Sequence, residues 1–225
     1  STNSNEVVSI SNEQLSSGRD YIYTGYVSEP IQTTSHIVQV GKPIGTFHGL
    51  KSIDITDDGL WIVEGKNKET GEWEPMRADK ADQNSWQDLG NGIPKHYLNW
   101  NNTIYFKGLD LNVNMRGAFG FQILNYQRMY YENAKSSIQY NRLNSAFKPV
   151  YGKSPVLDDQ RYVSYYIEDG DYWKIDNVTL GYTFKLPSQK IIKNLRIYGS
   201  VSNLATFTGY KGIDPEIPLN TGDDY

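Results

Sequence analysis

Apolar and polar side chains alternate along residues 109–123. Mostly apolar residues hold the odd positions of this segment, and polar or small residues hold the even ones. A period of two puts each set on its own face of a β-strand. The segment is longer than the usual soluble strand of about 5–6 residues, and a tilted strand crosses a membrane in about 9–11 residues. We therefore predict one long strand that is able to span a bilayer.

The neighbouring segment 97–107 alternates in part, and Gly108 separates it from the first. One very long strand and two strands joined by a tight hairpin both fit this pattern. Near the end of the chain, residues 177–184 and 195–202 alternate in the same way. Pro187 lies in the connection between them and has no N–H to donate to a strand ladder. We predict a second pair of strands there.

The connections differ in length at the two ends of these strands. Segments 126–170 and 205–225 are long, polar and aromatic, whereas the connections at Gly108 and 185–194 are short. Short turns at one end and long loops at the other are typical of an outer-membrane barrel.

The first half of the chain is less regular. It contains short strand candidates and one exposed hairpin tip, at residues 65–71. The strand candidates are 6–10, 37–40, 45–50, 60–64 and 72–76. Residues 133–138 are a candidate short helix, and little else is helical in pattern. The prediction is an all-β fold of antiparallel strands.

The composition of the chain excludes several classes of function. The chain of 225 residues has room for one domain or two small ones, and its net charge of −4 gives no reason to expect a nucleic-acid partner. With no cysteine, it has no disulfide, thiolate metal site or cysteine nucleophile. The mean hydropathy of −0.61 describes a soluble protein, but transmembrane β-strands are nearly invisible to hydropathy. Eighteen tyrosines and twenty glycines favour strands and long loops.

Candidate catalytic and metal chemistry is weak. Acidic residues cluster at 158–159 and 168–171, but a glycosidase needs two carboxyl groups about 5–10 Å apart, and acidic residues in polar loops are mostly solvated. Four oxygen ligands for calcium occur between residues 79 and 88, without the spacing or the central glycine of an EF-hand. They are Asp79, Asp82, Asn84 and Asp88. We predict no catalytic residue, no metal and no cofactor.

Tyrosines between the two regions of long strands are the better candidates for binding. A tyrosine ring has a flat apolar face and a hydroxyl group, which suit stacking on sugars or packing on a protein. The alternative is an aromatic girdle at the membrane interface, or packing within loops. The candidate ligand or partner contacts are Tyr126, Tyr130, Tyr131, Tyr165 and Tyr166.

Motifs in the last third of the chain resemble those of SusC/RagA-like TonB-dependent transporters. Residues 168–184, EDGDYWKIDNVTLGYTF, resemble a family signature, and residues 195–210, LRIYGSVSNLATFTGY, followed by GIDPE at 212–216, resemble the adjacent strand and the loop that leaves it. Upstream landmarks are VGKPIG at 40–45 and GNGIPK at 90–95. The resemblance covers most of the chain from about Ile37 onward.

This resemblance implies that residues 1–225 are a C-terminal section of a large plugged barrel of about 22 strands, without the plug, the earlier strands and the last strand. It implies import of glycans, oligosaccharides or peptides across the outer membrane of a Bacteroidetes-type bacterium, with energy supplied through TonB. A SusD-like surface lipoprotein is the implied partner, and nothing is chemically converted.

The same resemblance implies an orientation for the strands. The odd face of residues 109–123 meets lipid, Asp110, Asn112, Asn114 and Arg116 face the lumen, and residues 126–170 are extracellular. A soluble all-β carbohydrate-binding module is the alternative, in which the alternation marks a core face and a wet face. A glycan-cleaving enzyme is the third hypothesis.

Overall fold

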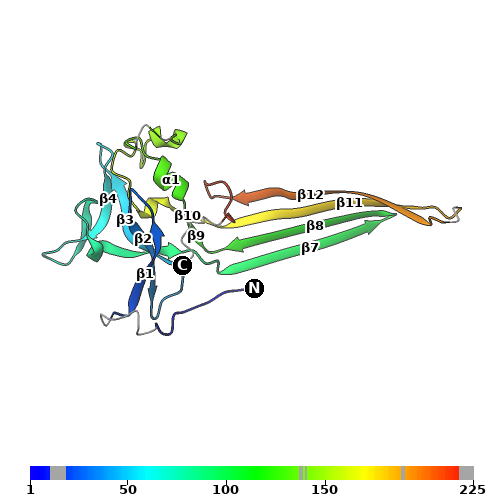
Figure 1. The fold of residues 1–225 in the computed structure, drawn as a ribbon, viewed down its shortest axis with the longest axis horizontal. Helices are drawn as coiled ribbons and strands as arrows, with labels where there is room; N and C mark the ends of the chain where they lie inside the picture. The colour runs from blue at the N-terminus through cyan, green and yellow to red at the C-terminus, as the bar shows by residue number, and fades with distance from the viewer. Residues whose placement is uncertain (11–18, 137–138, 140, 189–190, 218–225) are drawn as a thin grey trace.

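The computed structural model describes residues 1–10, 19–136, 139, 141–188 and 191–217. Figure 1 shows a compact unit of short strands and loops, from which a sheet of long strands extends. The chain is mostly antiparallel β-structure with very little helix. The predicted all-β fold class is therefore confirmed.

The long sheet consists of β7 (His96–Phe106), β8 (Leu109–Phe119), β11 (Tyr172–Lys185) and β12 (Asn194–Thr208). Their order across the sheet is β12-β11-β8-β7, and every neighbouring pair is antiparallel. Segments 177–184 and 195–202 lie within β11 and β12, as predicted, and segment 97–107 lies within β7 except for Lys107, which follows the end of the strand.

A two-residue hairpin joins β7 and β8. Lys107 and Gly108 both adopt positive φ, at 48° and 92°, as the type I′ turn between twisted antiparallel strands requires. Of the two arrangements that the sequence left open, the hairpin is observed. The connection from β11 to β12 lies at the same end, where the Thr183 N–H donates to the Gly108 carbonyl oxygen at 2.8 Å (Figure 1).

The register of the long sheet separates its two faces. Leu111 pairs with Ile104 on β7 and Leu180 on β11, and these apolar side chains share one face. Asn112 pairs with Thr103 and with Thr179, on the polar face. The register shifts between Ile175 and Asn177. A bulge of this kind redirects side chains locally, and here Asp176 contacts Arg116 of the polar face.

Residues 109–123 do not form one strand, which corrects that prediction. β8 ends at Phe119, and Gly120 then turns the chain with φ of +76°, a conformation that glycine adopts at little cost. The Gly120 N–H donates to Asp171 at 2.6 Å. Beyond this turn, β9 (Gln122–Leu124) leaves the long sheet and pairs with β10 (Ile167–Asp169).

The compact unit is built on a six-stranded sheet in which β1 to β5 follow one another and β6 pairs with β3. The predicted strands 37–40, 45–50, 60–64 and 72–76 lie at β2 to β5, and the predicted hairpin tip joins β4 to β5. β1 and β6 were not predicted. The bounds are β1 Tyr21–Val27, β2 Thr33–Gln39, β3 Thr46–Ile55, β4 Trp61–Lys66, β5 Trp73–Arg77 and β6 Trp86–Asn91.

The core of the compact unit lies between this sheet and the segment that follows β9. That segment contains α1 (Tyr126–Tyr131), η3 (Asn144–Phe147) and η4 (Ser164–Tyr166), and η2 (Gln83–Ser85) precedes β6. Among the described residues, the helices are too short and too polar to cross a membrane. The buried cluster includes Val27, Phe47, Ile55, Trp61, Val63, Met129, Val163 and Tyr166.

Two local predictions are wrong. The helix of this region is α1, where the Asn125 side chain accepts the Arg128 N–H at 3.0 Å and so caps the first turn. The helix predicted at 133–138 is instead a turn over its described part, 133–136, and residues 137–138 lie outside the described residues. Residues 6–10 form no strand, although Val7 exchanges backbone hydrogen bonds with Gly41 and Lys42.

Candidate functional site

The polar face of the long sheet is a ladder of hydrogen-bonded side chains. Asn112 donates to Asn101 at 3.1 Å and to Thr103 at 2.7 Å, and Asn114 donates to Asn112 at 3.2 Å. Across β11 and β12, Asn177 donates to Ser200 at 2.9 Å. These amides and hydroxyls hydrogen-bond to one another. The middle of the face is therefore polar, and it carries no formal charge because neither kind of group is ionised.

Charged pairs lie at the two ends of this ladder. Near the hairpin, Arg196 donates to Asp110 from Nε and Nη2, at 3.0 and 2.5 Å. Near the compact unit, Arg116 lies 2.8 Å from Asp176 and 3.0 Å from Glu216. The four predicted lumen-facing residues, Asp110, Asn112, Asn114 and Arg116, therefore share one face, although which compartment that face meets stays a prediction.

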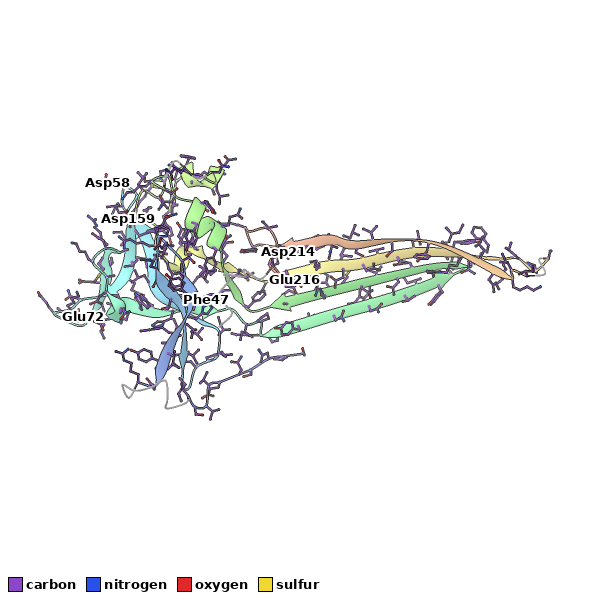
Figure 2. All side chains as sticks on the ribbon, in the orientation of Figure 1. Phe47, Asp58, Glu72, Asp159, Asp214 and Glu216 are labelled. Atoms are coloured by element: carbon purple, nitrogen blue, oxygen red, sulfur yellow. The ribbon has the colours of Figure 1, made fainter. Side chains whose placement is uncertain are left out.

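The loop after β12 returns to this polar face. We call residues 209–217 the strap. The Glu216 carboxylate accepts hydrogen bonds from Tyr172 Oη at 2.7 Å, Lys174 Nζ at 2.8 Å and Arg116 Nη2 at 3.0 Å. Figure 2 shows Asp214 and Glu216 at the end of the long sheet, where it meets the compact unit. Burial acts to raise the pKa of Glu216, but the hydrogen bonds from Lys174 and Tyr172 outweigh it and hold that pKa below its ordinary value.

The strap also contacts a buried ion cluster in the compact unit. The Lys211 N–H donates to Glu168 at 2.8 Å. Glu168 pairs with Arg128, which donates through Nη2 to Glu132 at 2.8 Å and lies 4.9 Å from the Tyr165 ring centroid. Burial acts to lower the pKa of Arg128, but its bonds to Glu132 and Glu168 outweigh it and raise that pKa. The cluster ties α1, β10 and the strap together.

The five candidate tyrosines occupy different environments. Tyr166 is 1% exposed and packs on Trp61 in the core, so it has no surface to offer a ligand, which corrects that prediction. Tyr165 is half-buried against Arg128. Tyr126 and Tyr130 stack with ring centroids 6.4 Å apart, and Tyr131 is 41% exposed. Their roles in binding stay predictions.

The Tyr130 hydroxyl donates to the carbonyl oxygen of Ser28 at 2.7 Å. Burial, together with the neighbouring phenols of Tyr126, Tyr26 and Tyr131, raises the pKa of Tyr130 to about 12. The Tyr130 phenol therefore stays protonated at neutral pH and keeps its hydrogen bond to Ser28.

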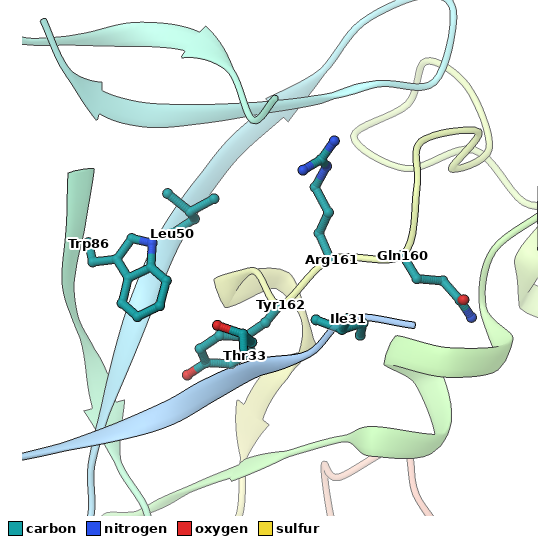
Figure 3. Close-up of a pocket in the computed structure, with 7 residues that line it drawn as sticks. All are labelled: Ile31, Thr33, Leu50, Trp86, Gln160, Arg161 and Tyr162. Atoms are coloured by element: carbon teal, nitrogen blue, oxygen red, sulfur yellow. The ribbon is translucent and has the colours of Figure 1, made fainter. Parts of the chain in front are cut away.

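A small pocket that the sequence did not reveal lies between the sheet and the segment 160–162. Trp86 and Tyr162 contribute rings to its wall, and Gln160 and Arg161 contribute polar groups (Figure 3). Its volume of about 140 Å³ is below the roughly 300–1,000 Å³ of a typical small-molecule site. It has room for a single ring or side chain of a larger ligand. The remaining lining residues are Ile31, Thr33 and Leu50.

The acidic residues at 79–88 are engaged in other contacts. Asp79 pairs with Arg77, Asp82 caps η2 through the Asn84 N–H, and Asp88 pairs with Lys42 and His48. Within the described ranges, no group of three or more histidine and acidic side chains is arranged to hold a metal ion.

The sequence of this chain is similar to those of known TonB-dependent receptors. The chain is 26% identical to TonB-dependent receptor P3 of Formosa agariphila over 232 residues, which cover 96% of this chain and 22% of that receptor. It is 27% identical to TonB-dependent receptor SusC of Bacteroides thetaiotaomicron over 121 residues, covering 50% of this chain and 12% of SusC. No family model matches the chain. The chain spans about a fifth of the length of the Formosa receptors that it matches.

The fold of this chain is similar to that of solved structures of an importer. A structure of the RagAB peptide importer in the closed-closed state superposes with a TM-score of 0.69, at 20% identity, over 88% of this chain and 22% of that chain. The open-open state of the same importer gives a TM-score of 0.68 over 93% of this chain.

The chain therefore has the fold of a section of a β-barrel TonB-dependent receptor, and its sheets do not close on themselves within the described residues. Within that class, it resembles the SusC/RagA-like TonB-dependent transporters. The relatives are named as receptors and importers rather than enzymes.

Proposed function

We propose that this chain, residues 1–225, is the C-terminal barrel section of an outer-membrane nutrient importer. The observation that carries the proposal is the long sheet, a single layer with one apolar face and one polar face. Ile104 on β7 and Ile197 on β12 are 57% and 59% exposed. Soluble monomers rarely expose apolar patches of more than a few hundred Å², whereas lipid covers such a face in a membrane barrel.

Strand length supports a sheet that crosses the membrane. β7 and β8 have 11 residues each, and a tilted transmembrane strand takes about 9–11. In this proposal the apolar face meets lipid, and Asp110, Asn112, Asn114 and Arg116 line the lumen. The Lys107–Gly108 hairpin lies on the periplasmic side, and the compact unit on the cell surface.

The proposed cargo is a glycan, an oligosaccharide or a peptide, moved with energy supplied through TonB and without chemical conversion. A SusD-like lipoprotein is the proposed surface partner. The relatives support both proposals, because one is SusC and another is the RagAB peptide importer. Tyr126, Tyr130, Tyr131 and Tyr165 stay the proposed contacts for cargo or partner, and Tyr131 is the most exposed of them.

The test places an arginine at either of two neighbouring positions of β8, one on each face of the sheet, in the full natural chain. Val113→Arg puts a charge on the proposed lipid face, which costs about 2–4 kcal/mol at mid-bilayer. Asn112→Arg puts the same charge on the proposed lumen face, where water solvates it. We expect Val113→Arg to reduce the heat-modifiable, membrane-extracted form much more than Asn112→Arg does.

Equal effects of the two substitutions would contradict the assigned faces. Recovery of the full natural chain from the soluble fraction as a detergent-free monomer would contradict membrane insertion altogether, and would favour a soluble carbohydrate-binding module.

A further inference from the structure

Three hydrogen-bond donors converge on one carboxylate at the end of the polar face. Arg116 of β8 and Lys174 of β11 are register partners, so their side chains leave the sheet side by side. Tyr172 lies two residues before Lys174 and therefore on the same face. All three groups donate to Glu216. The sheet thus builds the donor set, and the strap supplies the acceptor.

The donor set matches a carboxylate in geometry. Lys174 and Arg116 both donate to Oε2 of Glu216, and Tyr172 donates to Oε1. Both oxygens are engaged by donors on neighbouring strands. Charged hydrogen bonds of this kind are about twice as strong as neutral ones.

The charge balance also favours a monoanion. Asp176 lies 2.8 Å from Arg116, and Asp214 lies 3.4 Å from Lys174. With these two acids in place, the two cations have little charge left to stabilise a doubly charged phosphate. A planar, singly charged carboxylate fits better.

Glu216 reaches this site from a segment with its own local turn. The Glu216 N–H donates to Asp214 at 2.9 Å, and the Lys211 N–H contacts Glu168 in the compact unit. Beyond the half-buried Tyr210, the strap contacts the rest of the molecule through polar groups of Lys211, Asp214 and Glu216, and Ile213 is 84% exposed. Because the strap adds no apolar burial at Ile213, a competing carboxylate displaces mainly hydrogen bonds, which it replaces itself.

We propose that Arg116, Lys174 and Tyr172 form a carboxylate-binding site that the strap occupies with Glu216 in this structure, and that a carboxylate-bearing solute competes with Glu216 for it. The placement of the site on the path of cargo rests on the proposed function, because only a lumen-facing polar face meets cargo. The binding chemistry itself does not depend on that orientation.

The experiment removes the internal acceptor from the full natural chain in detergent. In Glu216→Ala, we expect trifluoroacetate, followed by its ¹⁹F NMR line width, to bind saturably and at least tenfold more tightly than in the unmodified protein. Trifluoroethanol, which has no charge, serves as the neutral probe. Glu72→Ala is the matched control, because Glu72 is an exposed glutamate at the far end of the compact unit (Figure 2).

A second substitution removes one of the three donors. Adding Lys174→Met to Glu216→Ala is expected to weaken trifluoroacetate binding at least tenfold, and Glu216→Gln replaces Glu216→Ala if the latter does not fold. Equal line broadening in Glu216→Ala, Glu72→Ala and the unmodified protein would overturn the site. Displacement of trifluoroacetate by phosphate at lower concentration than by acetate would overturn the carboxylate assignment. Neither result depends on membrane assembly, which the Val113 and Asn112 variants test separately.

Discussion

Arg196 and Asp110 pair across an intervening strand. Arg196 is on β12 and Asp110 is on β8, yet Arg196 Nη2 lies 2.5 Å from Asp110 Oδ2. The strand between them, β11, has Gly181 at this point, opposite Asp110 in the register. A Cβ atom at Gly181 would lie 2.6 Å from Arg196 Nη2 and 2.7 Å from the Asp110 carboxylate. The absence of a side chain on β11 leaves the space in which the ion pair forms.

We predict that Gly181→Ala separates this pair. All three atoms that the new Cβ would meet belong to the ends of the Arg196 and Asp110 side chains, so they move and the backbone of the sheet stays in place. The melting temperature of the assembled protein is expected to fall slightly. In an Asp110→Asn background, where the pair is already broken, the same substitution is expected to have a smaller effect. An equal decrease in both backgrounds would place the cost in the backbone.

We predict that acid releases the strap. Because the pKa of Glu216 in the folded protein lies below its ordinary value of 4.5, its contacts stabilise the strap fully above about pH 4.5 and are lost as the pH falls through the lowered pKa. The groups that face it are Arg116, Lys174, Tyr172 and Asp214. A fluorophore on Ile213→Cys, in a section of chain that has no other cysteine, reports release as a fall in anisotropy.

Glu216→Gln is the control for the pH experiment, because its amide does not titrate. We expect the labelled control to have low anisotropy already at neutral pH and a flatter response to acid. A transition of the same size and midpoint in both proteins would assign the release to another group.

We predict that Arg128→Ala destabilises the compact unit by about 3–5 kcal/mol, because it leaves the buried carboxylates of Glu132 and Glu168 without their cationic partner. Arg77→Ala is the control: Arg77 is half-exposed and pairs with Asp79 at the surface, where such a pair contributes about 0–1 kcal/mol. Native-state hydrogen exchange of the full natural chain measures the opening free energy of the compact unit. Similar losses in the two variants would contradict a buried cluster.

We predict that Trp61→Ala costs about 3–5 kcal/mol in the same exchange experiment, because it opens a cavity in the core. Trp61 is 1% exposed and contacts Tyr165 and Tyr166. Trp73 on β5 is 47% exposed, so Trp73→Ala is expected to change the opening free energy by about 0.5 kcal/mol or less. A comparable cost at Trp73 would show that a partner or the rest of the receptor covers it.

The sequence predicted the long sheet well, because a period of two survives wherever one face differs chemically from the other. The predicted strand 109–123 extends beyond the end of β8 and includes part of β9. Phe121 and Ile123 continue the alternation, although Gly120 turns the chain out of the sheet. No pattern in a single sequence distinguishes a glycine that turns the chain from one that stays within a strand, as Gly117 does.

The compact unit was harder to predict for a different reason. α1 has only six residues, fewer than two turns, so it has no room for a helical period. β1 carries tyrosines on both of its faces, which gives no clear alternation of apolar and polar positions.

The candidate site depends on contacts between distant residues. The tyrosines were found by composition, and this could not separate the core residue Tyr166 from the exposed residue Tyr131. The motif that contains Glu216 was identified by resemblance, but its contact with Lys174, 42 residues earlier in the chain, required the fold.

The polar ladder of the long sheet has a consequence for the movement of solutes. Its central amides and hydroxyls already donate to one another, as Asn112 does to Thr103, and they carry no net charge. If this face lines the lumen as proposed, its middle offers a passing molecule many weak and interchangeable contacts and no deep energy minimum. Tight binding is confined to the charged groups at the two ends, and a solute moves along the wall between them without being held.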